Sequence, residues 1–229
     1  MTQSVTQTQT KTVLVVASSH PELAGEANGT YLPELTHALH VLDERGLAWE
    51  LASPAGGAIP HYGDDADALT RSMLADPAFA ARLAATARLA DVDPARYDAV
   101  FYPGGYGLLF DLVDDAHSHR ILASFHGRGL PIAAVCHGPA ALARVELEGG
   151  AGLVEGRHLT GFTREEEAAM STLETVPVLL EALMLERGAI YRKKAAWKVL
   201  VVEDGALITG QNPASAQAVG EALARRLLD

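Results

Sequence analysis

The amino-acid sequence predicts an α/β fold, a three-layer α/β/α sandwich around a mostly parallel sheet. Three observations support this prediction. Apolar runs rich in β-branched residues, such as residues 12–17, are typical of parallel strands that helices cover on both faces. Segments with helical spacing alternate with these runs, a pattern that favours a parallel sheet. The length of 229 residues suits one domain with a substantial core.

The individual elements follow from this pattern in chain order. The strand 12–17 ends at a polar loop, and a helix with Leu35, Leu39 and Leu42 at inward spacing then continues to Gly46, a residue type that commonly ends helices. Asn212 is a plausible N-cap for the last helix. The other predicted strands are residues 48–52, 97–102, 131–135, 157–162 and a hairpin of 197–202 with 206–209, and the other predicted helices include residues 77–89, 119–128 and 173–187.

Two parts of the chain lie outside the alternating pattern. Residues 1–11 are rich in Gln and Thr and have no apolar core, so we expect a disordered tail. The connection of about 54–95 is long for a compact α/β unit, so we expect an insertion that caps one end of the sheet. Residues 12–229 would then form a single domain.

The only cysteine, Cys136, lies where the apolar run 131–135 ends. His137, Gly138 and Pro139 follow, and helical spacing then resumes. A strand that turns directly into a helix presents its corner residue to a cleft, which is the geometry of a nucleophile elbow. The amides and dipole at the start of that helix would favour the thiolate. A lone cysteine is more commonly a small buried hydrophobe, but this position indicates a nucleophile.

Two acidic segments and a glycine cluster are further candidates, and each has a purely structural alternative. Glu34, in the first turn of its helix, reads either as a surface carboxylate matched to the dipole or as a carboxyl group over the cleft, and the sequence alone favours the surface. The acids 165–167 usually begin an exposed helix, although one of them could orient a catalytic histidine. The glycines of residues 103–107 form either a tight turn or an oxyanion-binding loop.

Charge and composition exclude several classes of protein. The net charge of −11 disfavours nucleic-acid binding, because phosphate recognition needs clustered Lys and Arg. One cysteine excludes an internal disulfide framework, and no histidine spacing matches a metal motif, so we expect no metal. No apolar segment reaches the length of about 18 residues that a membrane span needs. We therefore expect a cytoplasmic protein that binds neither nucleic acid nor membrane.

The elbow 134–139 resembles the signature of the ThiJ/PfpI superfamily, whose class I glutamine amidotransferase-like fold has a flavodoxin-like sheet. The resemblance covers nearly the whole chain, from about residue 12 to residue 228. Several further motifs resemble in particular its heat-shock chaperone and glutathione-independent glyoxalase (glyoxalase III) branch. These motifs are residues 29–35, 97–100 leading to 103–105, 109–111, 160–163 and 209–215.

The resemblance implies a cofactor-free lyase that converts methylglyoxal and related 2-oxoaldehydes to 2-hydroxy acids. It implies that Cys136 is the nucleophile, which forms a hemithioacetal with the substrate, and that His137 is the catalytic histidine. It also implies that Glu34 donates a hydrogen bond to the cysteine and helps to move protons. In this respect the resemblance reverses the reading of Glu34 as a surface carboxylate.

The same resemblance extends to the rest of the site. The amides of Gly105 and His137 would form an oxyanion hole, and one of the acids after residue 162 would complete the triad, with Glu167 preferred and Glu166 next. Many relatives have a histidine where this chain has Tyr106, so a phenol replaces an imidazole in the cleft. The implied oxyanion and substrate-binding positions are Gly104, Gly105, Tyr106 and Gly138.

Other functions are compatible with the same residues. A stress-response holdase chaperone would use an exposed apolar surface near a dimer interface, and a homodimer is what the resemblance implies. A different cysteine chemistry, either deglycation or amide hydrolysis, would use the same elbow. An exposed thiol of low pKa could also act as a redox sensor, because it oxidises readily.

Overall fold

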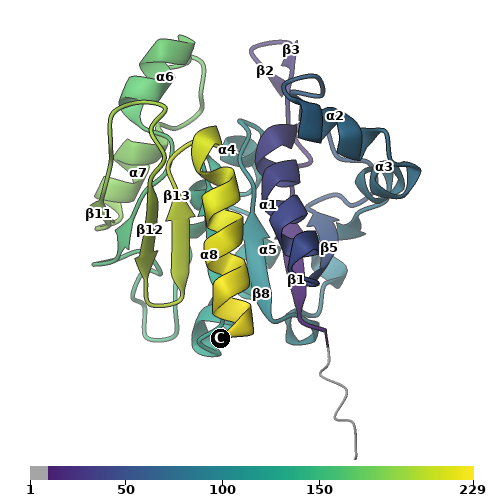
Figure 1. Cartoon of the computed structure of the whole chain (residues 1–229). Coiled ribbons are helices and arrows are strands. Elements are labelled where there is room, and N and C mark those ends of the chain that lie inside the picture. Colours follow the sequence, from purple (N-terminus) through teal and green to yellow (C-terminus); the bar gives the residue numbers. More distant parts are fainter. Residues whose placement is uncertain (1–9) are drawn as a thin grey trace, which may run out of the picture.

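A computed structural model describes residues 10–229, and its centre is a seven-stranded sheet (Figure 1). All neighbouring strands are parallel except the first pair. The order of the five central strands is that of flavodoxin-like folds, which confirms the predicted fold class. The predicted tail of residues 1–11 lies mostly outside the described residues. In spatial order the strands are β12 (Val201–Asp204), β13 (Leu207–Gly210), β9 (Ile132–Val135), β8 (Ala99–Tyr102), β1 (Thr12–Val16), β5 (Ala48–Ser53) and β7 (Ala87–Arg88).

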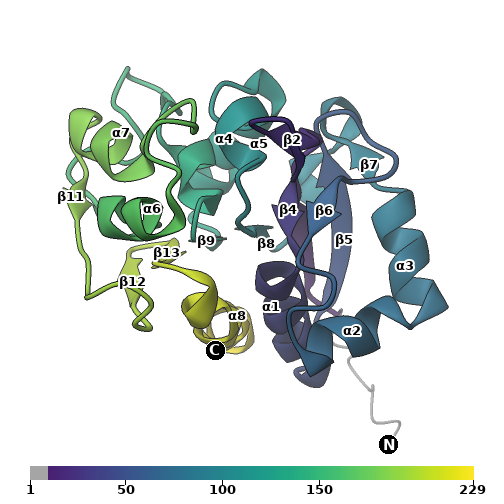
Figure 2. The same cartoon turned by 90° about the horizontal axis from the view of Figure 1, so that it is seen from above.

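Helices cover both faces of this sheet, as Figure 2 shows from above. On one face, α1 (Leu32–Glu44) and α8 (Ala216–Leu228) pack against each other. On the other face, α5 (Ala116–Gly127) packs against β8 and β9. Residues 13–16 of β1 are completely buried, as expected for a strand with helices on both sides.

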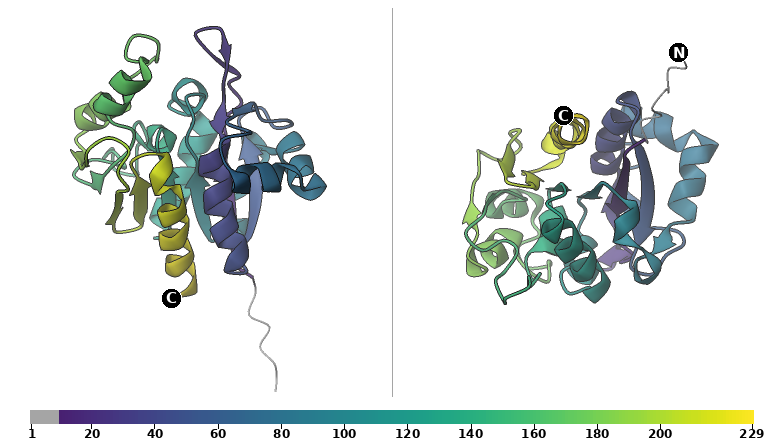
Figure 3. Two further views of the ribbon diagram at one scale, coloured as in Figure 1. Left: turned by 45° about the horizontal axis from the view of Figure 1, so that its top comes forward. Right: turned by 90° about the horizontal axis from the view of Figure 1, so that it is seen from below.

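The expected insertion lies beside β5 and α1 at one edge of the sheet (Figure 3). It contains β6 (His61–Tyr62), α2 (Ala68–Leu74) and α3 (Pro77–Ala84). The prediction of one helix over residues 77–89 is wrong at its end, because residues 87–88 pair with β5 and extend the sheet as its edge strand.

Two predicted strands of the second half are shorter than the apolar runs that indicate them. The run 157–162 forms only β10 (His158–Leu159), which pairs with β11 (Ile190–Tyr191) outside the main sheet. The first strand of the predicted hairpin begins at Val201 instead of residue 197. The hairpin itself is confirmed, with Gly205 in the left-handed region at φ 59°.

The predicted helices also differ from the structure at their ends. Residues 173–187 form only α7 (Leu180–Glu186), because Pro177 disfavours helical backbone at the residue before it. Asn212 does not cap the last helix with its side chain, which instead donates a hydrogen bond to Glu166. The remaining short elements are β2 (Glu22–Leu23), β3 (Glu26–Ala27), β4 (Thr30–Tyr31), α4 (Leu108–Asp111), α6 (Arg164–Met170) and 3₁₀ turns at Leu89–Asp91, Pro94–Arg96, Gly138–Leu142 and Pro213–Ser215.

The close packing of α1 against α8 predicts that the position of Gly220 tolerates no side chain. A Cβ atom on Gly220 of α8 would lie 3.0 Å from the Cα atom of Ala38 on α1. We expect Gly220→Val to lower the free energy of unfolding by about 1–3 kcal/mol, because the helices must separate. Gly127→Ala is the matched control, since a Cβ atom there meets nothing within 4 Å. Equal stability of both variants in urea unfolding would contradict this packing.

Candidate active site

Cys136 stands at a sharp corner directly after β9. Its φ of 58° lies in the left-handed region, which a residue with a side chain rarely adopts and which is typical of a nucleophile elbow. Hydrogen bonds hold both sides of the corner: the Cys136 amide donates to the Gly210 carbonyl at 2.9 Å, and the Cys136 carbonyl accepts from the Phe162 amide at 2.8 Å. The surrounding backbone therefore maintains a conformation that costs free energy.

The segment after the corner differs from the prediction. In place of a helix, residues 138–142 form one short 3₁₀ turn, which offers little dipole to stabilise a thiolate. A Cβ atom on Gly138 would lie 2.3 Å from the Tyr102 carbonyl oxygen, so only glycine fits where the turn crosses the end of β8. Gly138 therefore has a packing role in shaping the elbow.

His137 lies between the cysteine and a carboxylate. Its Nδ1 atom is 3.4 Å from the Cys136 Sγ atom, and its Nε2 atom is 2.7 Å from the Glu167 Oε1 atom. An ionised carboxylate only accepts hydrogen bonds, so Nε2 carries the proton and Nδ1 presents its lone pair to the thiol. The rings of Tyr106 and Phe162 each lie 4.5 Å from the imidazole and 6.5 Å from each other, so both contact it.

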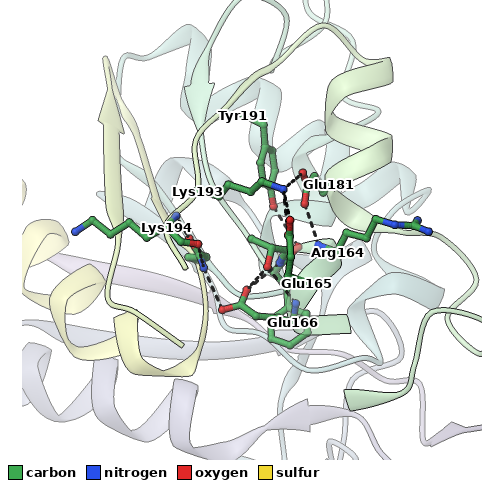
Figure 4. A network of polar contacts seen from close by, with 10 residues as sticks. Arg164, Glu165, Glu166, Glu181, Tyr191, Lys193 and Lys194 are labelled. Carbon is green, nitrogen blue, oxygen red and sulfur yellow. Dashed lines mark hydrogen bonds and ion pairs between the residues drawn. The ribbon is translucent and has the colours of Figure 1, made fainter. Parts of the chain in front are cut away.

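The three consecutive acids have three different environments. Glu165 is exposed and pairs with Lys193 at 2.9 Å (Figure 4). Glu166 is buried and forms a capping box with Thr163 at the start of α6. Glu167 is buried beside His137 and also accepts a hydrogen bond from the Thr172 hydroxyl. The expectation of an exposed helical turn therefore holds only for Glu165.

Glu34 is completely buried, so its sequence-based reading as a surface carboxylate is wrong. It lies in the first turn of α1, and burial raises its pKa to about 8. The Cys136 thiol and the Gly104 amide lower this pKa again, although neither reaches the geometry of a full hydrogen bond to the carboxyl group. The carboxyl group is consequently protonated over much of the neutral pH range.

The thiol is also harder to ionise than the sequence predicts. Burial raises the pKa of Cys136 well above its usual value, and Glu34, where it is ionised, raises this pKa further. The expectation of a resting thiolate is therefore wrong, because desolvation outweighs the weak dipole of the short turn. A thiol in this environment needs a base at the moment of reaction, and the lone pair of His137 faces it.

The glycine loop after β8 passes directly over these groups. A Cβ atom on Gly104 would lie 2.0 Å from the Glu34 Oε2 atom and 2.7 Å from the Cys136 Cβ atom. Gly105 has a φ of 117°, and a Cβ atom there would lie 2.3 Å from the Gly29 carbonyl oxygen. Within residues 10–229, the amides of Gly105 and His137 donate to no backbone carbonyl.

Cys136 lines a cavity of about 160 Å³. Tyr106 is part of its wall, and its hydroxyl group lies 3.2 Å from the Thr172 hydroxyl. The sequence-based prediction missed most of the wall, although Tyr31, Phe162 and Pro213 lie inside motifs that carry the family resemblance. No sequence signal marked Tyr62, Met170 or Trp197 as site residues. The lining residues are Tyr31, Tyr62, Tyr106, Cys136, His137, Phe162, Met170, Trp197 and Pro213.

Among the described residues, no group of three or more His, Cys, Asp or Glu side chains could hold a metal ion. Within the same part of the chain, no helix is both long and apolar enough to cross a membrane.

Comparisons with known proteins agree with each other. The model of the DJ-1/PfpI family matches residues 26–226. Glutathione-independent glyoxalase HSP31 of Saccharomyces cerevisiae is 27% identical over 90% of this chain and 93% of that protein. The structure of Rapid Encystment Protein 24 KDa of Francisella tularensis has a TM-score of 0.92 at 31% identity and covers 96% of this chain and 100% of that one. Glyoxalase III of Candida albicans has a TM-score of 0.87 at 25% identity, over 94% of this chain and 97% of that one.

Burial of Glu34 predicts a specific pH dependence of stability. The folded protein holds the Glu34 proton up to about pH 8, whereas the unfolded chain releases it near 4.5. Between these values the free energy of unfolding falls as pH rises, by about 1.4 kcal/mol per pH unit. Glu34→Gln removes this contribution, so urea unfolding from pH 5 to 8 should show a shallower slope for the variant.

Burial also raises the pKa of Asp111 to about 6, so this residue too makes the free energy of unfolding fall as pH rises. Because wild type and Glu34→Gln both contain Asp111, the difference between their slopes reports on Glu34 alone. Glu44→Gln, at the exposed end of the same helix, is the matched control and should retain the wild-type slope. Parallel curves for wild type and Glu34→Gln would contradict a buried, protonated Glu34.

Proposed function

This chain belongs to the DJ-1/PfpI family, and we propose on that premise that it is a glutathione-independent glyoxalase. The resemblance to the ThiJ/PfpI superfamily and its glyoxalase III branch is confirmed by the matches. The proposed reaction converts methylglyoxal and related 2-oxoaldehydes to 2-hydroxy acids. The observation that carries the proposal is the buried Glu34 beside a Cys136 whose other neighbour is the His137–Glu167 pair.

The first step forms a bond between sulfur and the aldehyde carbon. His137 Nδ1 takes the thiol proton as the Cys136 Sγ atom adds to the carbon. Glu167 acts as a positioning residue, because its carboxylate holds Nε2 and stabilises the imidazolium that forms. Glu34 gives its proton to the developing alkoxide, with the amides of Gly105 and His137 as further donors. The product is a hemithioacetal.

The second step moves two protons. It oxidises the former aldehyde carbon and reduces the adjacent carbonyl carbon. Glu34, now a carboxylate, removes the proton from the former aldehyde carbon and returns it to the adjacent carbon. The hydroxyl proton passes to the adjacent oxygen, which leaves a thioester on Cys136. A pKa of about 8 suits Glu34 to this exchange, because both of its forms are accessible near neutral pH.

Hydrolysis completes the cycle. Water attacks the thioester carbon, the carbon–sulfur bond breaks, and the sulfur regains its proton from His137. The proton released from the attacking water restores Glu34, and the 2-hydroxy acid leaves. The sum is one 2-oxoaldehyde and one water converted to one 2-hydroxy acid. The oxidation of one carbon balances the reduction of the other, so the reaction consumes no external oxidant or reductant.

The proposal includes two further statements. The protein forms a homodimer, as the family resemblance implies, and it acts in the cytoplasm, as its composition predicts. Its partner in the reaction is the small-molecule substrate.

Loss of the nucleophile tests the proposed reaction. In a glutathione-free assay that follows lactate formation from methylglyoxal, we expect Cys136→Ala to lower kcat by more than about a thousandfold. Retained activity in this variant would rule out the proposal. The holdase alternative predicts a different pair of results. The wild type would form no lactate, and Cys136→Ala would still suppress aggregation of a client protein.

The role of Glu167 is tested separately. Glu167→Gln can offer an amide N–H to His137 and so favour the wrong tautomer, which we expect to lower kcat by about a hundredfold or more. Glu165→Gln, on the exposed neighbour, should leave kcat unchanged. A kcat of Glu167→Gln equal to that of the wild type would contradict the role of Glu167 as a positioning residue.

A further inference from the structure

The wall of the catalytic cavity is mostly aromatic. Five of its nine lining residues are Tyr, Phe or Trp, none is Lys or Arg, and the only ionisable groups besides the tyrosines are Cys136 and His137. Burial raises the pKa of Tyr31 and Tyr62, so these phenols stay neutral. The wall therefore offers a substrate flat apolar surfaces and no cation to pair with a carboxylate or phosphate. The methyl group of methylglyoxal covers little of such a surface.

Trp197 is held at this wall in an unusual conformation. Its φ of 64° is left-handed, which is costly for a bulky residue. Its amide donates to the Glu166 Oε1 atom at 2.8 Å, and the indole packs edge-on against Phe162 at 5.8 Å. The side chain is nevertheless 45% exposed. A strained backbone thus presents a large aromatic surface that the protein itself leaves partly uncovered.

Glu166 fixes this arrangement from inside the protein. The carboxylate is completely buried, and the same oxygen that accepts from Trp197 also accepts from Gln211 at 3.0 Å and Asn212 at 2.7 Å. Its other oxygen accepts from the amide and hydroxyl of Thr163. The network around the neighbouring Lys193 and Glu181 ties the same loop to α6 and α7 (Figure 4). The position of the indole is therefore preorganised.

Met170 belongs to the same cavity. It is the last residue of α6 and is 51% exposed. A thioether is polarisable and packs favourably against aromatic rings. Met170 and Trp197 are the two lining residues that combine a large apolar side chain with high exposure.

We propose that this site selects 2-oxoaldehydes that carry a flat apolar ring over those that carry a methyl group, with Trp197 as the specificity-determining residue. The inference rests on the proposed glyoxalase function and names its substrate class. The ring of the substituent would contact Trp197 and Met170 while the aldehyde carbon lies at Cys136. Contact between aromatic surfaces adds to the hydrophobic gain of burial.

The test compares phenylglyoxal with methylglyoxal, both without glutathione, with mandelate and lactate as the measured products. We expect wild-type kcat/KM to be about tenfold or more higher for phenylglyoxal. Because the two aldehydes differ in intrinsic reactivity, the decisive quantity is the change of this ratio on mutation. Trp197→Ala should lower the ratio by about tenfold, and Met170→Ala should lower it in the same direction.

Two variants serve as controls. Trp197→Phe keeps an aromatic ring and should retain most of the preference, which also guards against misfolding of Trp197→Ala. Val199→Ala removes a side chain that is 47% exposed in the same loop but does not line the cavity, so it should leave both substrates unaffected. Circular dichroism of each variant reports whether it is folded.

The outcomes separate the inference from its premise. A ratio that Trp197→Ala leaves unchanged, while Cys136→Ala abolishes both reactions, overturns the substrate preference and leaves the glyoxalase function standing. Absence of Cys136-dependent turnover for both aldehydes overturns the proposed function and the preference with it.

Discussion

The burial of one carboxyl group beside one thiol is the constraint on which the rest of this site depends. Water is excluded from Glu34, and burial therefore favours its protonated form at pH values where an exposed glutamate is ionised. The same desolvation keeps the Cys136 proton in place. An ionised Glu34 would further disfavour the Cys136 thiolate, because two negative charges in a dry site repel each other. At rest, both Glu34 and Cys136 are therefore protonated. This suits a reaction in which protons move between these groups and the substrate without leaving the protein.

Close backbone approach is what makes this burial possible. The loop at Gly104 leaves no room for a Cβ atom against Glu34 and Cys136, and Gly138 leaves none against the end of β8. The three strand ends that meet here belong to a flavodoxin-like sheet, where ligands bind at the carboxyl edge near the change of strand order. The left-handed backbone at Cys136 is tolerated because its amide and its carbonyl each form a backbone hydrogen bond, to Gly210 and Phe162. The fold, the elbow at Cys136 and the buried, protonated Glu34 therefore depend on the same packing.

Much of this could be predicted from the sequence, and the parts that could not are those set by tertiary contacts. Apolar runs predict the strands well, because burial on both faces of a parallel sheet leaves a direct mark on composition. The position of Cys136 at a strand end follows from the same signal. The burial of Glu34 does not, because it depends on a glycine loop far away in the chain. The choice among the three acids depends on how α6 is rotated, which places Glu167 on His137 and Glu166 on Trp197. The acidity of the thiol is predicted in the wrong direction, because burial raises the pKa of Cys136 and the short 3₁₀ turn offers little dipole to oppose it.

The most direct test of this account is the titration of the Glu34 side chain itself. Carbon-13 NMR of the protein labelled at the glutamate carboxyl groups would follow it, with the Glu34 resonance assigned by its loss in Glu34→Gln. The account predicts a midpoint near pH 8, the value to which burial raises this pKa. A midpoint near the ordinary value of 4.5 would show an ionised carboxylate beside Cys136 and would contradict the buried, protonated Glu34 at the centre of the site.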